Sequence, residues 1–277
     1  MNTQIVLSGE QRLESDAPLR IFQITDTHLM GHAGGCLLEM DTDASLAAVL
    51  TLARQKAASP DAVLVTGDIA GEASAGAYQR FIEHMGDLAD VAFWLPGNHD
   101  DSLMPEAAGQ FLRRSIVSDA WQIVMLNSQV PNQVGGHVSA DELASLEQLI
   151  ASANAHKRHL LVALHHHLLP VGCAWLDEQR IDNADRVRQI LAGAAQKVVV
   201  INGHVHQESD QTLDGIRYLS APSTCVQFAP GQTRFKVDAK GPGFRVLELW
   251  PDGRIETQVI RLPDDQFSVD LSSGGYE

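Results

Sequence analysis

Five short polar blocks in this sequence carry side chains of the kinds that bind metal ions. They are Asp26-Thr27-His28, Gly67-Asp68, Gly97-Asn98-His99-Asp100, His165-His166-His167 and Gly203-His204-Val205-His206. None of the blocks contains Lys or Arg, so carboxylates brought together from them would have no basic partner of that kind. Asp, Asn and His suit divalent ions such as manganese, iron and zinc. The blocks therefore predict metal-dependent chemistry.

The number of candidate ligands favours two metal ions over one. Two carboxylates, one carboxamide and four imidazoles exceed the needs of a single tetrahedral ion, but they serve two ions if one carboxylate bridges them. Two ions about 3.5–4 Å apart can bind a hydroxide and hold a phosphoryl group from both sides. The three cysteines, Cys36, Cys173 and Cys225, form no CxxC pair. They predict reduced thiols in a cytoplasmic protein and no structural zinc site.

Each block follows an apolar stretch that predicts a β-strand. The expected strands before the blocks cover residues 20–25, 61–66, 91–95, 159–164 and 197–201, with a further strand at 121–127. Apolar residues at helical spacing predict helices over 43–58, 75–88, 106–114, 139–153 and 183–194. Because the carboxyl ends of parallel strands meet at one edge of an open α/β sheet, we expect the blocks to form one site.

The pattern changes after Gly203, where helical spacing ends and hairpins begin. One hairpin is expected at 210–213 and 216–220 around Asp-Gly, and a second at 244–250 and 255–261 around Pro-Asp-Gly. Strand–helix–strand units followed by hairpins predict an α/β fold, a layered sandwich of two mixed β-sheets flanked by helices. We expect one domain at 20–262, an N-terminal extension at 1–19 and a polar C-terminal tail at 263–277.

The charge balance limits the kinds of partner. The chain has 20 Lys and Arg against 35 Asp and Glu, a formal net charge of −15. Such a surface repels nucleic-acid polymers and anionic membranes. The first 18 residues lack a signal-peptide pattern, and no apolar run is long enough to span a membrane. We expect a cytoplasmic protein that binds a small molecule, with no prediction of its oligomeric state.

In order and spacing, the five blocks resemble the signature of calcineurin-like metallophosphoesterases, which reads D-x-H, G-D, G-N-H-D, a strand-end His and G-H-x-H. The segments ITDTHL, HHHLLPVGCAWLD, GHVHQE and PSTCVQF also resemble bacterial class III cyclic AMP phosphodiesterases. D-x-H and G-D alone are weak signals, G-N-H-D and G-H-x-H are moderately specific, and the conjunction of all five blocks is highly specific. The resemblance implies the calcineurin-like fold. It also implies hydrolysis of 3′,5′-cyclic AMP to 5′-AMP by a hydroxide that two divalent ions, iron and/or manganese, activate.

The resemblance also implies roles for individual residues. One ion is expected to bind three side chains, namely Asp26, His28 and His206. The other is expected to bind Asn98, His165 and His204, with Asp68 bridging the two ions. His99 is expected to be catalytic, stabilising developing charge and protonating the leaving oxygen. Together with His28 and Asn98, it is also expected beside the nucleotide phosphate.

The histidine run departs from the family pattern, because Leu168 replaces a proline that usually follows it. His165 is the preferred ligand since it is the first residue past the apolar strand. His166 or His167 could assist it, or could serve as donors or pocket wall. Asp100-Asp101 is expected to cap the next helix or to accept a proton from a ligand histidine.

The sequence leaves the substrate-facing wall and the substrate open. Trp175 and Phe228 could stack on an adenine or could belong to the core. An alternative substrate is another small diester, such as a 2′,3′-cyclic nucleotide or a glycerophosphodiester, because a two-metal site serves all of them. A third hypothesis is a non-catalytic scaffold of the same fold. It is disfavoured because all seven expected ligand positions hold residues that can bind a metal ion.

Overall fold

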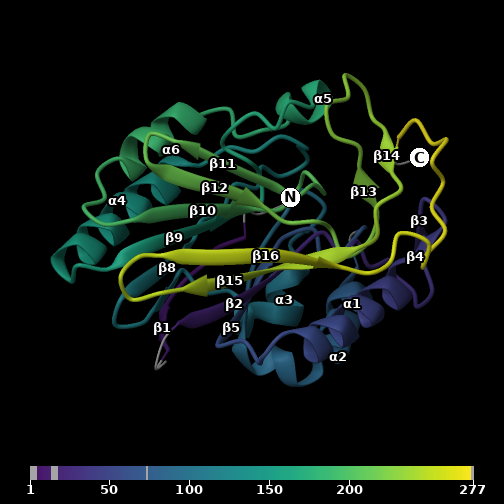
Figure 1. Ribbon diagram of the computed structural model, residues 1–277, viewed down its shortest axis with the longest axis horizontal. Coiled ribbons are helices and arrows are strands. Elements are labelled where there is room, and N and C mark those ends of the chain that lie inside the picture. Colours follow the sequence, from purple (N-terminus) through teal and green to yellow (C-terminus); the bar gives the residue numbers. More distant parts are fainter. Residues whose placement is uncertain (1–4, 14–17, 73, 276–277) are drawn as a thin grey trace.

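Two β-sheets form the centre of the protein, and helices cover their outer faces (Figure 1). The computed structural model describes residues 5–13, 18–72 and 74–275. The first sheet contains, in spatial order, β1 (Glu10–Arg12), β7 (Ser115–Val117), β8 (Trp121–Met125), β9 (His159–Leu164), β10 (Val198–Asn202), β12 (Ile216–Ser220) and β11 (Ser209–Leu213). The second contains β16 (Ile255–Arg261), β15 (Gly243–Leu249), β2 (Leu19–Ile24), β5 (Ala62–Thr66) and β6 (Ala92–Leu95). The predicted sandwich of two mixed sheets is confirmed.

The helices form the two outer layers. The five-stranded sheet is covered by α1 (Thr42–Lys56), α2 (Ala75–Met85) and α3 (Met104–Ala108) (Figure 1). The seven-stranded sheet is covered by α4 (Ala140–Ala155) and α6 (Ala184–Leu191) (Figure 1). The predicted N-cap of α4 is present, since the Ser139 hydroxyl accepts the Glu142 N–H at 3.3 Å. Among the described residues, no helix is both long and apolar enough to span a lipid bilayer.

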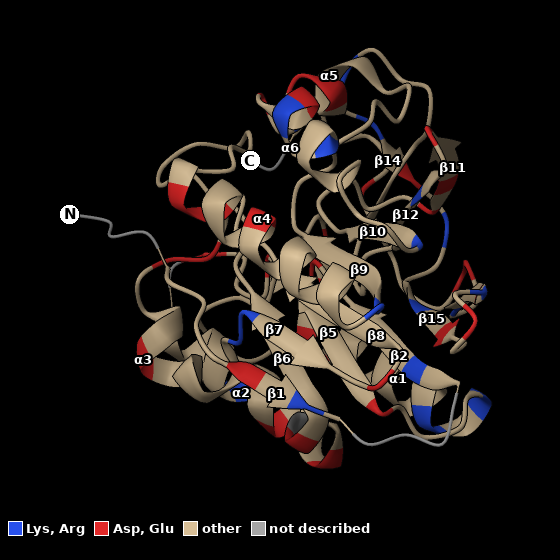
Figure 2. Cartoon of the chain, turned by 90° about the vertical axis from the view of Figure 1, so that its left-hand side faces the viewer, with Lys and Arg blue, Asp and Glu red and all other residues tan. Residues whose placement is uncertain are grey.

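The central strands are buried on both faces, which explains their nearly continuous apolar sequences. In β9, Leu161 and Ala163 join the core between the two sheets. The alternate residues Leu160, Val162 and Leu164 join the core beneath α4 and α6. The ribbon of β8, β9 and β10 accordingly carries no charged residue, and the acidic and basic residues lie on helices, loops and other strands (Figure 2). Because both faces of these strands are packed, the loops that follow their carboxyl ends start from firmly held positions.

Strand direction brings the predicted blocks to one edge. β2, β5 and β6 run parallel to one another, and so do β8, β9, β10 and β12. Both predicted hairpins are present, as β11–β12 and β15–β16. Asp214 and Gly215 have φ values of 53° and 79°, as a tight Asp-Gly hairpin turn requires.

The predicted helix over residues 106–114 is wrong in extent. α3 ends at Ala108, the 3-10 turn η2 (Gly109–Phe111) follows, and β7 begins at Ser115. Gly109 disfavours a longer helix. Arg114, at the end of the predicted helix, is bound to the Glu142 carboxylate of α4, at 2.6 Å for one of the two contacts.

Several short elements have no counterpart in the sequence-based expectations. These are β1, β7, β3 (Cys36–Leu37), β4 (Met40–Asp41), β13 (Gln227–Phe228), β14 (Val237–Asp238), η1 (Gly86–Val91) and α5 (Ala174–Asp177). β1 lies within the predicted N-terminal extension, pairs with β7 and has three exposed residues. Elements of two to six residues contain too few positions to show a hydrophobic period.

The two-sided burial of β9 gives a first prediction. Leu161→Ala should lower the free energy of unfolding by about 2–5 kcal/mol, because it leaves a cavity between the two sheets. Leu213→Ala, at a side chain that is 38% exposed, should change it by no more than about 0.5 kcal/mol. Urea denaturation of both variants measures the difference. Equal losses in the two variants would contradict the assigned core.

Candidate metal centre

The structure brings all seven predicted ligand side chains to the carboxyl edge of the two sheets. They follow β2, β5 and β6 in one sheet and β9 and β10 in the other, and they are Asp26, His28, Asp68, Asn98, His165, His204 and His206. We call these seven residues the ligand cluster. Six of them are less than 9% exposed, Asn98 being the half-buried exception. Buried carboxylates and imidazoles so close together require a compensating partner.

One half of the ligand cluster contains Asp26, His28 and His206, whose possible ligand atoms all lie within 4.8 Å of one another. Nε2 of His206 lies 3.4 Å from the Asp26 carboxylate and 3.2 Å from Nε2 of His28. Nδ1 of His206 donates to the Val226 carbonyl at 2.8 Å. This hydrogen bond fixes the tautomer, so the Nε2 lone pair of His206 faces Asp26 and His28.

The other half of the cluster gathers around Asn98. Its carbonyl oxygen lies 3.0 Å from Nε2 of His165 and 3.0 Å from Nδ1 of His204. Nδ1 of His165 donates to the Thr66 carbonyl at 2.8 Å, which again leaves Nε2 facing the cluster. Asp68 lies between the halves, with its carboxylate 3.2 Å from Nε2 of His165 and 3.9 Å from Nε2 of His28. It is the residue that could reach two ions.

The donor atoms of the cluster fit divalent ions. They are nitrogen and oxygen atoms only, a set that suits manganese, iron or zinc at non-structural sites. Nε2 of His28 faces Nε2 of His206. When each ring carries its proton on Nδ1, both of these Nε2 atoms are hydrogen-bond acceptors, and neither can donate to the other. A cation between them would satisfy both nitrogens. The residues present therefore fit a pair of divalent ions.

Backbone conformation is unusual throughout the cluster. Five of its residues have positive φ values between 46° and 66°, namely Asp26, His28, Asp68, His204 and His206. Residues other than glycine rarely occupy this region, and each instance costs on the order of 1–3 kcal/mol. Such strain persists where the surrounding structure overrides it, and it directs these side chains toward one point.

Two glycines, Gly97 and Gly203, allow the loops to approach closely. A Cβ atom on Gly97 would lie 2.1 Å from the Asp68 carboxylate, and one on Gly203 would lie 2.2 Å from the Thr25 hydroxyl. Neither position has room for a side chain. The Asp68 and Asp26 carboxylates are therefore packed directly against the backbone of neighbouring loops.

Asp100 has a role that the sequence did not predict. Its carboxylate accepts the N–H groups of Gly97 at 2.9 Å, Ala70 at 3.1 Å and Ile69 at 3.2 Å. It thus ties the loop after β5 to the loop after β6, and it does not cap α3. Burial and the nearby Asp68 charge raise the pKa of Asp100 to about 7. Asp101 does not cap α3 either, since the N-cap residue is Leu103 and receives no side-chain cap; the Asp101 carboxylate accepts the Leu103 N–H at 3.0 Å in a local turn.

Burial and mutual charge shift the pKa values of the cluster. Burial, reinforced by His99, holds the pKa of His28 well below its usual range, and burial does the same for His204. Burial also opposes the charge on His165, but the Asp68 carboxylate outweighs it and raises the pKa of His165 to about 9. At neutral pH, His28 and His204 are therefore neutral, while His165 forms an ion pair with Asp68.

Within the histidine run, His165 is the residue whose Nε2 lies beside both Asn98 and Asp68. His166 is close to His165 and His204, but Nδ1 contacts the Ser128 hydroxyl at 2.9 Å and Nε2 contacts the Val134 carbonyl at 2.9 Å. His167 faces away from the cluster centre, with Nε2 3.6 Å from the Asp177 carboxylate. These two residues support the wall of the site.

His99 lies beside the cluster. Its backbone N–H donates to Asp68 at 2.9 Å, and its Nδ1 donates to the Gly71 carbonyl at 3.1 Å. Its ring packs edge-on against His28, with centroids 4.8 Å apart. His99 also lines a cavity of about 360 Å³ together with Asp68, Asn98, His204 and His206. The predicted catalytic histidine therefore faces the same space as the cluster.

Sequence reasoning missed part of this cavity. Its other lining residues come from the loop between β8 and α4, from α5 and the residues after it, and from the segment around β13; they include Val134, Trp175, Gln179, Phe228 and Phe235. Trp175 and Phe228 were considered for adenine stacking, but Gln179 and Phe235 were not. A hydrophobic residue beside a predicted ligand strand carries no sequence signal that distinguishes a pocket wall from core.

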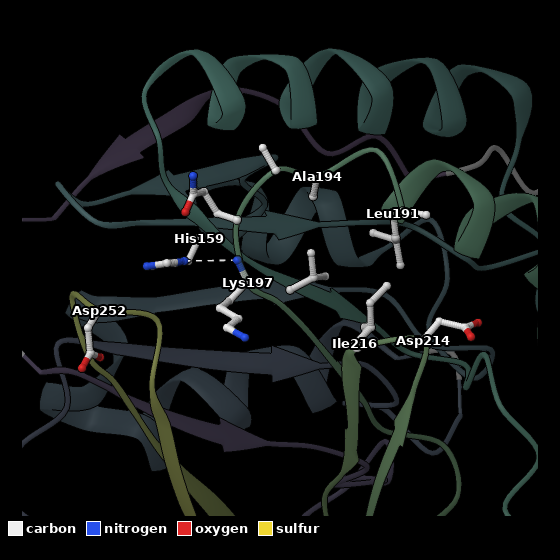
Figure 3. A pocket seen from close by; sticks show the side chains of 12 residues that line it. His159, Leu191, Ala194, Lys197, Asp214, Ile216 and Asp252 are labelled. Carbon is white, nitrogen blue, oxygen red and sulfur yellow. Dashed lines mark hydrogen bonds between the residues drawn. The ribbon is translucent and has the colours of Figure 1, made fainter.

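A second cavity, of about 440 Å³, lies at the opposite ends of β9, β10 and β12 (Figure 3). His159 and Lys197 line it, together with Asp214 and Asp252. His159 is buried; its Nδ1 accepts the Lys197 N–H and its Nε2 donates to the Pro251 carbonyl, at 3.2 Å each. One ring nitrogen thus joins β9 to the residue before β10 and the other joins β9 to the β15–β16 turn, and the chemical groups of this cavity do not converge.

Comparison with known proteins agrees with this geometry. The model of the calcineurin-like phosphoesterase family matches residues 19–208. The 3′,5′-cyclic adenosine monophosphate phosphodiesterase CpdA of Escherichia coli (strain K12) is 40% identical over 269 residues, covering 95% of this chain and 97% of that protein. The protein of the same name from Pseudomonas aeruginosa is 38% identical over 265 residues, with the same coverage.

Solved structures show the same fold at low sequence identity. A dimetal phosphatase from Danio rerio aligns with a TM-score of 0.62 and 14% identity, over 89% of this chain and 99% of that one. At this identity the likeness concerns the fold alone. The family model, the sequence relatives and the fold all agree: the chain belongs to the calcineurin-like phosphoesterase family.

Proposed function

We propose that this protein hydrolyses 3′,5′-cyclic AMP to 5′-AMP with the help of two divalent metal ions. The observation that carries the proposal is the convergence of seven nitrogen- and oxygen-bearing side chains on one cavity. Calcineurin-like phosphoesterases use a binuclear divalent metal centre. The substrate is supported by relatives that are 35–40% identical and named 3′,5′-cyclic adenosine monophosphate phosphodiesterase.

The halves of the ligand cluster divide the two ions between them. Asp26, His28 and His206 would hold one ion, Asn98, His165 and His204 would hold the other, and Asp68 would bridge them. Iron and/or manganese are the ions proposed, as the family resemblance implies, and a donor set with imidazole and carboxylate but no thiolate is compatible with them. Such ions supply Lewis acidity, which lowers the pKa of water and neutralises charge on a phosphoryl group.

The protein's own residues bind and orient the phosphodiester. Two divalent charges and the carboxylates of Asp26 and Asp68 sum to +2, so the site attracts an anionic diester to an otherwise acidic protein. The Asn98 carbonyl oxygen faces His165 and His204. Its amide nitrogen therefore points away from them, and we assign it to donate to a phosphate oxygen. His28, packed against His99, lies beside the same phosphate.

His99 is assigned to the leaving group. Nδ1 donates its proton to the Gly71 carbonyl, so Nε2 is the ring nitrogen from which a proton would pass to the leaving oxygen. Transfer of that proton to the 3′-oxygen as its bond to phosphorus breaks would leave a neutral imidazole that retains its hydrogen bond. The backbone bond from His99 to Asp68 holds the ring at this place.

The proposed location is the cytoplasm, and the proposed partner is the small-molecule nucleotide alone. Cys36, Cys173 and Cys225 are thiols in the structure, and reducing compartments preserve thiols. The net charge of −15 disfavours a nucleic-acid polymer as substrate.

The function is tested with metal-stripped protein reloaded with manganese or iron. It should convert 3′,5′-cyclic AMP to 5′-AMP, and Asn98→Ala should lose this activity by about 100-fold or more, since Asn98 contacts both His165 and His204. Chromatography of the products measures both. Hydrolysis of only 2′,3′-cyclic AMP or a glycerophosphodiester would discard the cyclic AMP assignment. Absence of both metal uptake and hydrolysis would favour a scaffold.

The role of His99 gives a separate prediction. His99→Ala should reduce turnover of cyclic AMP by about 10²–10⁴-fold, the usual contribution of a general acid, and should leave metal content unchanged. Elemental analysis of the purified variant provides the second readout. A His99→Ala enzyme with full turnover and intact metal would remove His99 from the mechanism.

The raised pKa of His165 gives a prediction for metal binding. In the metal-free protein His165 is protonated at pH 7, because its pKa lies at about 9. A metal ion binds only the neutral imidazole, so loading at pH 7 should release about one proton from this residue, and the apparent affinity should rise as the pH approaches 9. Calorimetry of manganese binding in two buffers of different ionisation enthalpy counts the protons.

The matched controls are two histidine variants. His165→Asn should release about one proton fewer than the unmodified protein at pH 7, whereas His156→Asn, at an exposed position after α4, should release the same number. Equal release from all three proteins would show that His165 is not a protonated ligand.

A further inference from the structure

The cavity beside the ligand cluster has a second wall that the metal chemistry does not use. It consists of Trp175, Phe228 and Phe235, which we call the aromatic wall. Trp175 comes from α5, Phe228 from β13 and Phe235 from the segment between β13 and β14, and these elements lie at the α5–β14 side of the molecule (Figure 1). Trp175 follows the His165 block in the sequence, whereas Phe228 and Phe235 follow the block of His204 and His206.

Ring geometry divides the aromatic wall into a support and a surface. Phe228 is buried and stacks on His206 with centroids 4.2 Å apart and planes 10° apart. Trp175 and Phe235 are half-buried and line the cavity. The three rings contact one another at 5.1–5.3 Å, in tilted or edge-on arrangements. Phe228 therefore packs between His206 and the two rings that face the cavity, and it holds those rings at a fixed distance from His206.

The wall is held in place by its own hydrogen bonds. The Ala174 N–H donates to the Gln232 carbonyl at 3.0 Å, which joins the start of α5 to the segment that carries Phe235. The Asp177 carboxylate accepts the Val171 N–H at 2.7 Å and lies 3.6 Å from His167, which follows β9. A wall fixed before a ligand arrives costs little conformational entropy on binding.

The chemistry of this wall does not suit a phosphate. Its cavity-facing residues are aromatic or aliphatic, with the Gln179 amide as a polar group, and the described lining of the cavity contains no Lys or Arg. Flat apolar rings with one amide suit a flat heterocycle that has hydrogen-bonding edges. A nucleobase joined through a sugar to a phosphodiester at the ligand cluster is such a group.

We propose that Trp175 and Phe235 bind the face of the substrate's purine and that Gln179 hydrogen-bonds to its edge. This inference rests on the proposed cyclic nucleotide phosphodiesterase function and names its specificity-determining residues. Stacking on aromatic side chains contributes on the order of 10- to 100-fold in affinity and is tolerant of base identity. The amide of Gln179 offers one donor and one acceptor, which match N6–H and a ring nitrogen of adenine.

The stacking part is tested by binding, without turnover. Manganese-loaded protein should bind 5′-AMP about 10- to 100-fold more tightly than ribose 5-phosphate, which has the same phosphate and no base. Trp175→Ala should reduce that ratio to about 3 or less, and Trp175→Phe should retain most of it. Trp250→Phe, at the β15–β16 turn, is the matched control and should leave the ratio unchanged.

Fluorescence gives an independent readout of the same complex. Stacking of adenine on Trp175 should quench tryptophan emission on addition of 5′-AMP, and the quenching should disappear in Trp175→Ala while it persists in Trp250→Phe. A ratio unchanged in Trp175→Ala would overturn the proposal, even if cyclic AMP is hydrolysed. Failure of the unmodified enzyme to hydrolyse cyclic AMP, with other diesters cleaved, would overturn the proposed function instead.

The edge contact is tested by changing the hydrogen-bonding pattern of residue 179. Gln179→Glu offers acceptors only, so it should repel a ring nitrogen of adenine and accept from N1–H and N2–H of guanine. The ratio of kcat/KM for cyclic AMP over cyclic GMP should fall about tenfold in this variant. Gln179→Leu should lower both values without this reversal. An unchanged ratio in Gln179→Glu would remove Gln179 from base recognition.

Discussion

The burial of the Asp26 and Asp68 carboxylates among imidazoles is the constraint on which the rest of the structure depends. Both carboxylates are at most 2% exposed, and no lysine or arginine stands among the residues of the ligand cluster. Without a metal, Asp68 relies on a proton held by His165. A buried ion pair seldom repays its desolvation, and positive φ angles add further strain. The rest of the fold must therefore offset the unfavourable free energy of the buried charges and of the strained backbone at the site.

This offsetting stability comes from the two sheets and from contacts between them. β9 and β10 bury both faces in two separate cores, so their carboxyl ends move little relative to β2 and β5. Directly beneath the site, the buried Gln23 amide donates to the Asn202 carbonyl and to the Thr66 hydroxyl, at 3.0 Å each. It therefore joins the second sheet to the first. The loops above are linked in turn, with the Gly203 N–H donating to the His165 carbonyl at 3.1 Å.

The sequence predicted the parts of the site that belong to long strands. Each ligand block follows an apolar run whose length and composition are visible in the chain, so parallel strands place Asp68 and His165 at a common edge without further information. The roles of Gln23, Asp100 and Phe235 could not be predicted from the sequence. Their roles depend on which loops and sheets become neighbours, and polar residues within a strand or rings within a loop carry no periodic signal. The predicted helix at 106–114 erred where Arg114 has a tertiary partner in Glu142.

The residues of the ligand cluster directly follow long strands, whereas the aromatic wall lies on short elements and loops. This difference bears on which substrate the protein binds. A phosphodiester group is common to many molecules, so a ligand cluster alone cannot distinguish them. Selectivity must come from residues such as Trp175 and Gln179, which lie on the one-turn helix α5 and just after it. Such segments can change without disturbing the buried strands. The same fold can therefore serve different esters, which is why the motifs identify the family while the aromatic wall bears on the substrate.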